Sequence, residues 1–273
     1  LRLLPIGAGG ILANLPYSPL MAAGGLLDVL YQAGIANELF PLLIFVGVGA
    51  MTDFGPLLEN PKLALLGAAG QFGIFATLLL ALIVGFDLNE AASIGIIGTI
   101  DGPTSIYVSH RLAPQLLGPI AVAAYSYMAL VPLIQPPIMR WLIPTADRRI
   151  RMSYSARPLR RRTRVLFPIV TTIVVGFLVP MAVPLIGTLM LGNLMKESGV
   201  VERLTKASAN EIANVVTLFM GLAVGATMQA DAFLHWETLA VLALGCVAFA
   251  LDTAAGLVVA RGMKALSHGQ FNP

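Results

Sequence analysis

The sequence predicts an all-α, polytopic membrane protein built from inverted repeats with discontinuous and re-entrant helices. Of its 273 residues 57% are hydrophobic and only 11% are charged, whereas a soluble domain normally carries about a quarter charged residues. A chain this apolar is expected to lie in lipid. The 27 glycines and 18 prolines, many of them inside apolar segments, predict broken helices. Membranes tolerate such breaks where protein covers the freed backbone or a wet cavity receives it.

Apolar segments predict the membrane elements in chain order. Residues 63–86, 115–143 and 238–260 form segments that are each long enough to cross the bilayer once. Shorter or glycine- and proline-interrupted segments lie at residues 40–52, 91–108, 165–195 and 212–228. We therefore expect three full spans with shorter or broken elements between them.

One loop is strongly basic, because eight arginines fall within 17 residues: Arg148, Arg149, Arg151, Arg157, Arg160, Arg161, Arg162 and Arg164. Basic loops beside membrane spans stay in the cytoplasm, so we expect residues 146–164 to form a cytoplasmic loop. Nucleic acid is not an expected partner, because Tyr154 is the only aromatic residue among the arginines. An anionic lipid surface or an acidic partner is the alternative ligand for this charge.

Two pairs of similar short segments, called sequence echoes below, predict an internal duplication. Asn14 and Asn193 occupy similar short motifs at an offset of 179, and residues 48–51 resemble residues 224–227 at an offset of 176. Two echoes in the same order at nearly one offset favour a true repeat over chance similarity.

The charges that flank two spans predict that the repeats are inverted. Lys62 precedes the span 63–86, whereas Glu237 precedes the span 238–260 and Arg261 follows it. The positive-inside rule then sends the two spans in opposite directions, as inverted-repeat transporters require.

Three regions follow from the repeat and from the positive-inside rule. We expect a first inverted repeat at 1–113, a linking span with the basic loop at 114–164, and a second inverted repeat, truncated at its C-terminal end, at 165–273. Because the spans that flank residues 91–110 both meet the outer side, this segment is expected to be re-entrant, with its tip near Asp101.

Asp101 is the leading candidate for ion chemistry. It lies beside Gly102 and Pro103 inside an apolar segment, and Thr104 and Ser105 follow. A carboxylate in the bilayer is costly unless it gains a partner, a cation or a proton. Carboxylate, hydroxyl and unwound carbonyl oxygens are hard ligands that suit Na⁺ or a titrating proton. The alternative is an ordinary helix N-cap with proline in the first turn.

Other polar residues inside apolar segments are secondary candidates. Tyr125 and Tyr127 lie close to mid-span, where a phenol needs a hydrogen-bond partner and can relay a proton; an aromatic belt is the simpler interpretation. Asn14 and Asn193 either ligate an ion or bond neighbouring helices together, the more common role of buried amides. Asp252 is a second intramembrane acid that belongs to no recognisable motif.

Four motifs closely resemble one family; they lie at residues 46–56, 94–104, 125–137 and 192–200. The family is that of the membrane β-subunits of biotin-dependent, sodium-pumping decarboxylases, which act on oxaloacetate, methylmalonyl-CoA, glutaconyl-CoA or malonate. The resemblance runs from Leu4 to Pro273.

The resemblance implies a subunit that decarboxylates carboxybiotin and couples this step to Na⁺ export with consumption of a proton. Na⁺ and carboxybiotin are thus the implied cofactors, the latter presented by a biotin-carrying carboxyltransferase α-subunit and not bound covalently here. A small membrane γ-subunit, the lipid bilayer and further copies of the complex are the other implied partners. The implied location is the cytoplasmic (inner) membrane of a bacterium or archaeon.

The family motifs also imply roles for single residues. Asp101 takes the central place in Na⁺ binding and coupling, Tyr127 handles protons and ions, and Asn272 opens an Asn-Pro motif that serves the ion. The residue chemistry adds Thr104, Ser105 and Asn193 as candidate Na⁺ ligands. The remainder of the Asn-Pro motif is expected after Pro273 and a further stretch before Leu1, so we expect the sequence to be a fragment that lacks both ends.

Two other classes of function fit the bare residue pattern. A secondary transporter, either a Na⁺/H⁺ antiporter or a Na⁺-coupled anion symporter, shares the inverted repeats and the intramembrane acid. A membrane anchor without catalytic function is less consistent with a costly carboxylate beside Gly102 and Pro103. Release of CO₂ from carboxybiotin distinguishes the decarboxylase from both.

Overall fold

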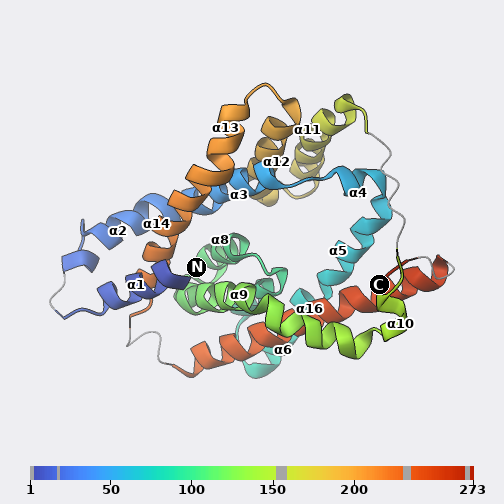
Figure 1. Ribbon diagram of the computed structural model, residues 1–273. Coiled ribbons are helices and arrows are strands. Elements are labelled where there is room, and N and C mark those ends of the chain that lie inside the picture. The colour runs from blue at the N-terminus through green and yellow to red at the C-terminus, as the bar shows by residue number, and fades with distance from the viewer. Residues whose placement is uncertain (1–2, 17–18, 152–158, 230–234, 268–270) are drawn as a thin grey trace. The chain divides into compact units, whose positions relative to one another are not determined.

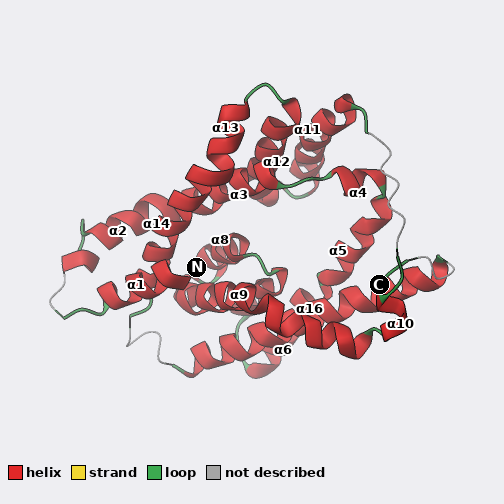
Figure 2. Cartoon of the chain, in the orientation of Figure 1, coloured by secondary structure: helices red, strands yellow, loops and turns green. Residues whose placement is uncertain are grey.

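A computed structural model describes the chain except for residues 1–2, 17–18, 152–158, 230–234 and 268–270. Every regular element among the described residues is helical (Figure 2), which confirms the predicted all-α class. The predicted cytoplasmic loop 146–164 is described only at its two ends, and Arg157 lies outside the described residues.

Three helical stretches in the described part of the chain are long and apolar enough to cross a bilayer: Pro61–Val84, Glu202–Ala226 and Trp236–Leu266. The first and third confirm the spans predicted at 63–86 and 238–260. The second is longer than the short segment expected at 212–228, and that expectation is wrong. Its first residues are charged, which lowers the hydropathy, yet they continue the helix instead of forming a loop.

Two bent helix pairs raise the number of spans to five if each pair crosses as one. Pro19–Ile35 meets Leu39–Met51 at 58°, and Pro114–Met128 meets Leu130–Leu142 at 62°. The second pair corresponds to the span predicted at 115–143. Prolines inside this segment explain its bend, because a proline removes a helical hydrogen bond and clashes with the preceding turn.

The chain folds into two compact units, and each unit combines two separate segments of the sequence. The first unit comprises Leu1–Glu59 with Arg157–Phe233, and the second comprises Asn60–Ala156 with Leu234–Pro273. Each unit therefore draws on both predicted repeats. The boundaries 1–113, 114–164 and 165–273 describe repeats and not compact units, and they stay a prediction.

The first unit contains eight α-helices among its described residues (Figure 1): α1 (Leu3–Ala13), α2 (Leu26–Leu30), α3 (Leu39–Met51), α4 (Gly55–Glu59), α11 (Arg161–Leu178), α12 (Val183–Ser198), α13 (Glu202–Ala207) and α14 (Ala213–Ala226). Helix α1 packs along α14, and α3 packs along α12. Glycines permit both crossings: a Cβ on Gly225 would clash with the carbonyl of Ile6, and a Cβ on Gly192 would clash with that of Val46.

The same local pattern occurs twice in the first unit. Helix α2 leads through the π-helical turn Tyr31–Ile35 towards α3, and α13 leads through the π-helical turn Ser208–Ile212 into α14. The two turns begin 177 residues apart, within the range of offsets that the sequence echoes give. Single π-helical turns are rare, so their recurrence at this spacing supports a duplication.

The second unit contains seven α-helices among its described residues: α5 (Ala64–Gly70), α6 (Phe72–Val84), α7 (Leu88–Gly95), α8 (Gly102–Leu112), α9 (Leu117–Leu142), α10 (Thr145–Arg148) and α16 (Trp236–Leu266). Helix α16 packs against α5, α6 and α9. The core of this unit is formed mainly by side chains from α6, α7, α9, α16 and the 3-10 turn Ile96–Thr99, among them Ile94, Ile97, Tyr127 and Phe249.

The segment predicted to be re-entrant is a helix, a break and a second helix. Helix α7 begins at an N-capping box formed by Asp87 and Glu90 and continues into a 3-10 turn, Ile96–Thr99. Helix α8 then starts at Gly102 and packs against α7. At about 1.5 Å per residue the two α-helices are about 12 and 16 Å long, and each is too short to cross an apolar layer of about 30 Å.

Candidate functional site

The backbone is strained at the tip of this hairpin. Ile100 has a φ of 57° in the left-handed region, and Asp101 next to it is extended, with φ −123° and ψ 104°. A β-branched residue with positive φ is a rare conformation that costs on the order of 1–3 kcal/mol, and such residues cluster at functional sites. The left-handed conformation of Ile100 reverses the chain between the 3-10 turn and α8, and Asp101 lies at this break.

Hydroxyl groups surround Asp101. The Thr104 hydroxyl donates a hydrogen bond to the Asp101 carboxylate, and the Ser105 hydroxyl donates to the Asp101 backbone carbonyl at 2.9 Å. The Asp101 N–H donates to Oγ1 of Thr99 at 3.3 Å. The structure thus brings together three of the predicted ion-site residues. Thr99 is a contact that the sequence reasoning missed, although a threonine two residues before the acid is the signal that could have found it.

Asp101 occupies the N-cap position of α8, as the alternative interpretation predicted, but its side chain does not make the capping hydrogen bond. Asp101 is the N-cap residue of α8, and Pro103 stands in the first turn. Its side chain makes no capping bond to the backbone N–H groups of that turn, and it accepts from the hydroxyl of Thr104 instead.

The two predicted tyrosines lie in different environments. The ring of Tyr125 rests on Gly102, where a Cβ would lie 2.5 Å from two ring atoms. The ring of Tyr127 rests on Gly245 of α16, and its hydroxyl donates to the backbone carbonyl of Leu242. Of the two phenols, Tyr125 is the one whose ring lies against the break, whereas the contacts of Tyr127 are made with α16.

Asn193 makes a bond between helices of the first unit. Its amide donates to the carbonyl of Thr52 at 3.2 Å, and Nζ of Lys196 donates to the same carbonyl at 2.9 Å. Asn14 makes the corresponding bond to the carbonyl of Met228 at 2.8 Å, and the two acceptor residues are 176 apart in the sequence. These contacts support a role in joining helices over a role as ion ligands.

Asn272 contacts the last residue of α10 and the segment that follows it. Its amide donates to the carbonyl of Ile150 at 2.8 Å and, more weakly, to that of Arg148 at 3.4 Å. The contacts hold the Asn-Pro segment in the second unit, the unit that contains Asp101. Its role as a Na⁺ ligand stays a prediction.

A second carboxylate lies in the same unit. Asp252 in α16 is 8% exposed, and its Oδ1 accepts a hydrogen bond from the N–H of Gly73 at 2.8 Å. Gly73 stands in the first turn of α6, just after the turn residue Gln71, so Asp252 caps this helix from a neighbouring one. The sequence identifies Asp252 as an intramembrane acid but does not predict its hydrogen bond with Gly73.

Asp252 also lines a cavity of about 350 Å³ within the second unit. Residues from α5, α9, α16 and the Asn-Pro segment surround it together with Ile100: Leu66, Gly70, Ile100, Gln135, Met139, Asp252, Thr253, Gly256, Leu257, Ala260 and Pro273. Ile100 directly precedes Asp101, so one wall of the cavity is formed by the strained residue at the tip of the hairpin.

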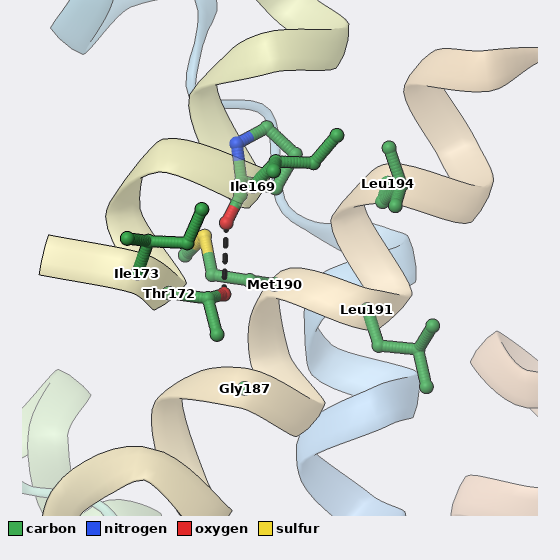
Figure 3. A pocket seen from close by; sticks show the side chains of 8 residues that line it. Ile169, Thr172, Ile173, Gly187, Met190, Leu191 and Leu194 are labelled. Carbon is green, nitrogen blue, oxygen red and sulfur yellow. Dashed lines mark hydrogen bonds between the residues drawn. The ribbon is translucent and has the colours of Figure 1, made fainter. Parts of the chain in front are cut away.

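A cavity of about 280 Å³ between α11 and α12 in the first unit has a different character (Figure 3). Ile169, Ile173 and Leu191 are typical of its apolar lining. The hydroxyl of Thr172, the polar side chain there, already donates to the carbonyl of Pro168 at 2.8 Å. This cavity offers apolar contact and no chemistry for an ion or a proton.

Comparison with known proteins gives one consistent result. A family model described as the Na⁺-transporting oxaloacetate decarboxylase beta subunit matches residues 1–273. The methylmalonyl-CoA decarboxylase subunit beta of Propionigenium modestum is 51% identical over 298 residues, which cover 100% of this chain and 75% of the relative. The oxaloacetate decarboxylase beta chain of Klebsiella pneumoniae is 54% identical over 257 residues, 92% of this chain and 59% of the relative.

The glutaconyl-CoA decarboxylase subunit beta of Acidaminococcus fermentans is 50% identical over 273 residues, which cover 100% of this chain and 72% of the relative. The chain therefore spans between about three-fifths and three-quarters of the length of these relatives.

Proposed function

Because the chain belongs to the family of Na⁺-transporting oxaloacetate decarboxylase β subunits, we propose that it couples decarboxylation of carboxybiotin to Na⁺ export through Asp101. The family membership confirms the resemblance stated from the motifs. It favours a decarboxylase subunit over the secondary transporter and the passive anchor that fit the bare residue pattern.

The observation that carries the proposal is the carboxylate of Asp101 at a helix break, within reach of the Thr104 hydroxyl. A carboxylate in a membrane protein's interior needs a proton or a cation to offset its desolvation. Carboxylate and hydroxyl oxygens are hard ligands, and a hydroxyl that donates to the acid can turn its lone pairs to a bound cation. The break thus suits the exchange of one proton for one Na⁺.

This exchange matches the chemistry of the substrate. When carboxybiotin loses CO₂, the bond between the ureido nitrogen and the carboxyl carbon breaks, and the nitrogen keeps the electron pair and takes up a proton. When Asp101 supplies the proton that this nitrogen takes up, Asp101 becomes a carboxylate that binds Na⁺. Reprotonation then releases the ion, so the consumption of a proton and the transport of Na⁺ share one group.

The partners follow from the same family. The relatives carry the names of β subunits or β chains, so they function within multi-subunit decarboxylases. We propose that a biotin-carrying α-subunit presents carboxybiotin to this chain and that a small membrane γ-subunit completes an oligomeric complex in the cytoplasmic membrane. The acyl substrate is then chosen by the α-subunit.

The Na⁺ dependence of carboxybiotin decarboxylation tests the proposal. In the assembled complex the initial rate of CO₂ release is expected to rise with Na⁺ concentration, and Asp101→Asn is expected to remove this stimulation while leaving assembly intact. Asp87→Asn is the matched control, because Asp87 is an exposed acid in the same hairpin and asparagine is an equally good N-cap. An unchanged Na⁺ response in Asp101→Asn would show that the acid is not the coupling group.

A further inference from the structure

We propose that the cavity beside Asp252 is a second Na⁺ site, in which this carboxylate alternates between the ion and a proton. The proposal rests on the sodium-transporting function proposed above, and it assigns a role to the intramembrane acid that belongs to no motif. Four features of the second unit support it: the burial of the acid, its uncompensated charge, the oxygen atoms around the cavity and the position of the cavity between two repeat-related spans.

The carboxylate is buried without an ion-pair partner among the described residues that line its cavity. Asp252 is 8% exposed, and none of the described lining residues is an arginine, a lysine or a histidine. Two cations further along α16 are engaged elsewhere: Arg261 donates to the carbonyl of Leu142, and Lys264 forms an ion pair with Asp147. The N–H of Gly73 offsets only part of the charge, so the ionised acid requires a cation.

The cavity supplies the atoms that Na⁺ prefers. Gln135 and Thr253 line it together with Asp252, so α9 and α16 supply carboxylate, amide and hydroxyl groups. The Thr253 hydroxyl donates to the carbonyl of Phe249 at 2.9 Å and keeps its oxygen lone pairs for a cation. These are hard oxygen donors of the kind that bind group I and II cations. At about 30 Å³ for each water molecule, 350 Å³ accommodates an ion with part of its hydration shell.

The position of the cavity is that of an ion site in a repeat transporter. Gly73 and Asp252 are 179 residues apart, the offset of the sequence repeat, and they are in direct contact. The two repeat-related spans therefore meet at this point, where α5 gives way to α6 at the single turn residue Gln71 within the helical stretch Pro61–Val84. Coupling ions in inverted-repeat transporters bind where the repeats meet, at discontinuous helices.

The cavity also adjoins the first site. Ile100 forms part of its wall and directly precedes Asp101 in the chain. Asp101 thus follows the strained residue in sequence, and Asp252 lines the same cavity as that residue. An ion that leaves Asp101 has a second carboxylate within the same unit, and the two sites offer successive positions along one path.

Carbodiimide labelling tests the second site without relying on pumping. Dicyclohexylcarbodiimide modifies protonated carboxyl groups in apolar surroundings, and a bound cation excludes both proton and reagent. The experiment uses the assembled complex carrying Asp101→Asn, at one fixed pH, so that the first site neither reacts nor holds the ion. Modification of Asp252 is then measured by mass spectrometry over a series of Na⁺ concentrations, with choline at equal ionic strength as the control.

We expect Asp252 to be modified in the absence of Na⁺ and to be protected as Na⁺ rises. Gln135→Leu is expected to raise the Na⁺ concentration for half-protection about tenfold, the effect of losing about 1.4 kcal/mol of binding. Modification that does not respond to Na⁺, or no modification of Asp252 without Na⁺, would overturn the second site. Because the labelling is read in a variant that lacks Asp101, its result is independent of whether Asp101 proves to be the coupling group.

Discussion

The side-chain amide of Asn193 in α12 donates a hydrogen bond to the backbone carbonyl of Thr52, which follows α3, at 3.2 Å. Asn193 is 1% exposed, so this bond is made away from solvent. Asn193→Ala is expected to lower the free energy of unfolding by about 1 kcal/mol, because the bond between the helices is lost while Lys196 still donates to the same carbonyl. The Na⁺ concentration for half-maximal decarboxylation should not change.

Thermal unfolding in detergent and a Na⁺ titration of the same preparation measure the two effects. Asn210→Ala is the control, since Asn210 is exposed and bonds only one turn back, to the carbonyl of Lys206. A large increase in the Na⁺ requirement of Asn193→Ala, without loss of stability, would restore the prediction that Asn193 is an ion ligand.

The crossing of α3 and α12 depends on glycine at position 192. A Cβ there would clash with the carbonyl of Val46, whereas a Cβ on Gly187 in the same helix has Thr172 Cγ2 as its nearest neighbour, at 3.7 Å. Gly192→Ala is expected to destabilise the protein by about 1–3 kcal/mol. Gly187→Ala should be neutral or stabilising by up to about 1 kcal/mol, because alanine is the better helix former. Equal melting temperatures of the two variants would contradict the close crossing.

The hydroxyl of Thr104 is expected to tune the affinity of the Asp101 site. Thr104→Val keeps the shape of the side chain but removes the hydroxyl that bonds the carboxylate, and Thr104→Ser keeps the hydroxyl. The valine variant should need about tenfold more Na⁺ for half-maximal decarboxylation, the effect of losing about 1.4 kcal/mol. The serine variant should stay close to the wild type. A Na⁺ titration that fails to separate valine from serine would remove Thr104 from the ion site.

The contact between the Tyr125 ring and Gly102 is expected to fix the position of the first turn of α8. A Cβ at position 102 would lie 2.5 Å from the phenol ring, so Gly102→Ala should displace either the ring or the start of α8 and impair Na⁺ stimulation. A second change, Tyr125→Val, makes room and should restore part of the response. Gly67→Ala is the control, because a Cβ there meets nothing within 4 Å. Failure of the double variant to improve on Gly102→Ala would contradict the contact.

Composition and the length of the apolar segments are sufficient to predict the fold class, because in lipid the backbone must bond internally and segments of about 20 apolar residues match membrane-spanning helices. The spans at 63–86 and 238–260 could be predicted for the same reason, and the re-entrant segment at Asp101 was expected from the orientation of the spans on either side of it. The span Glu202–Ala226 was not, because its charged first residues resemble a loop when hydropathy is the only guide. Hydropathy measures the preferred surroundings of a segment and does not report whether its backbone continues as a helix.

The candidate site was predictable in its residues but only partly in its contacts. Asp101, Thr104 and Ser105 are neighbours in sequence at a helix start, so local geometry brings them together. Tyr125 and Tyr127 were expected to face different neighbours, since residues two apart on a helix point in different directions, but the sequence does not predict that these neighbours are Gly102 and Gly245. The bond from Gly73 to Asp252 joins residues 179 apart and depends on how the two spans cross, which no local pattern encodes.

Coupling through Asp101 is tested most directly by the ratio of Na⁺ taken up to CO₂ released in sealed proteoliposomes that contain the assembled complex. Wild type and Asp87→Asn are predicted to accumulate Na⁺ in a fixed ratio to CO₂. Asp101→Asn is predicted to assemble normally and to accumulate no Na⁺, because it can neither bind the ion as a carboxylate nor exchange it for a proton. Na⁺ uptake by Asp101→Asn at the wild-type ratio would contradict the account.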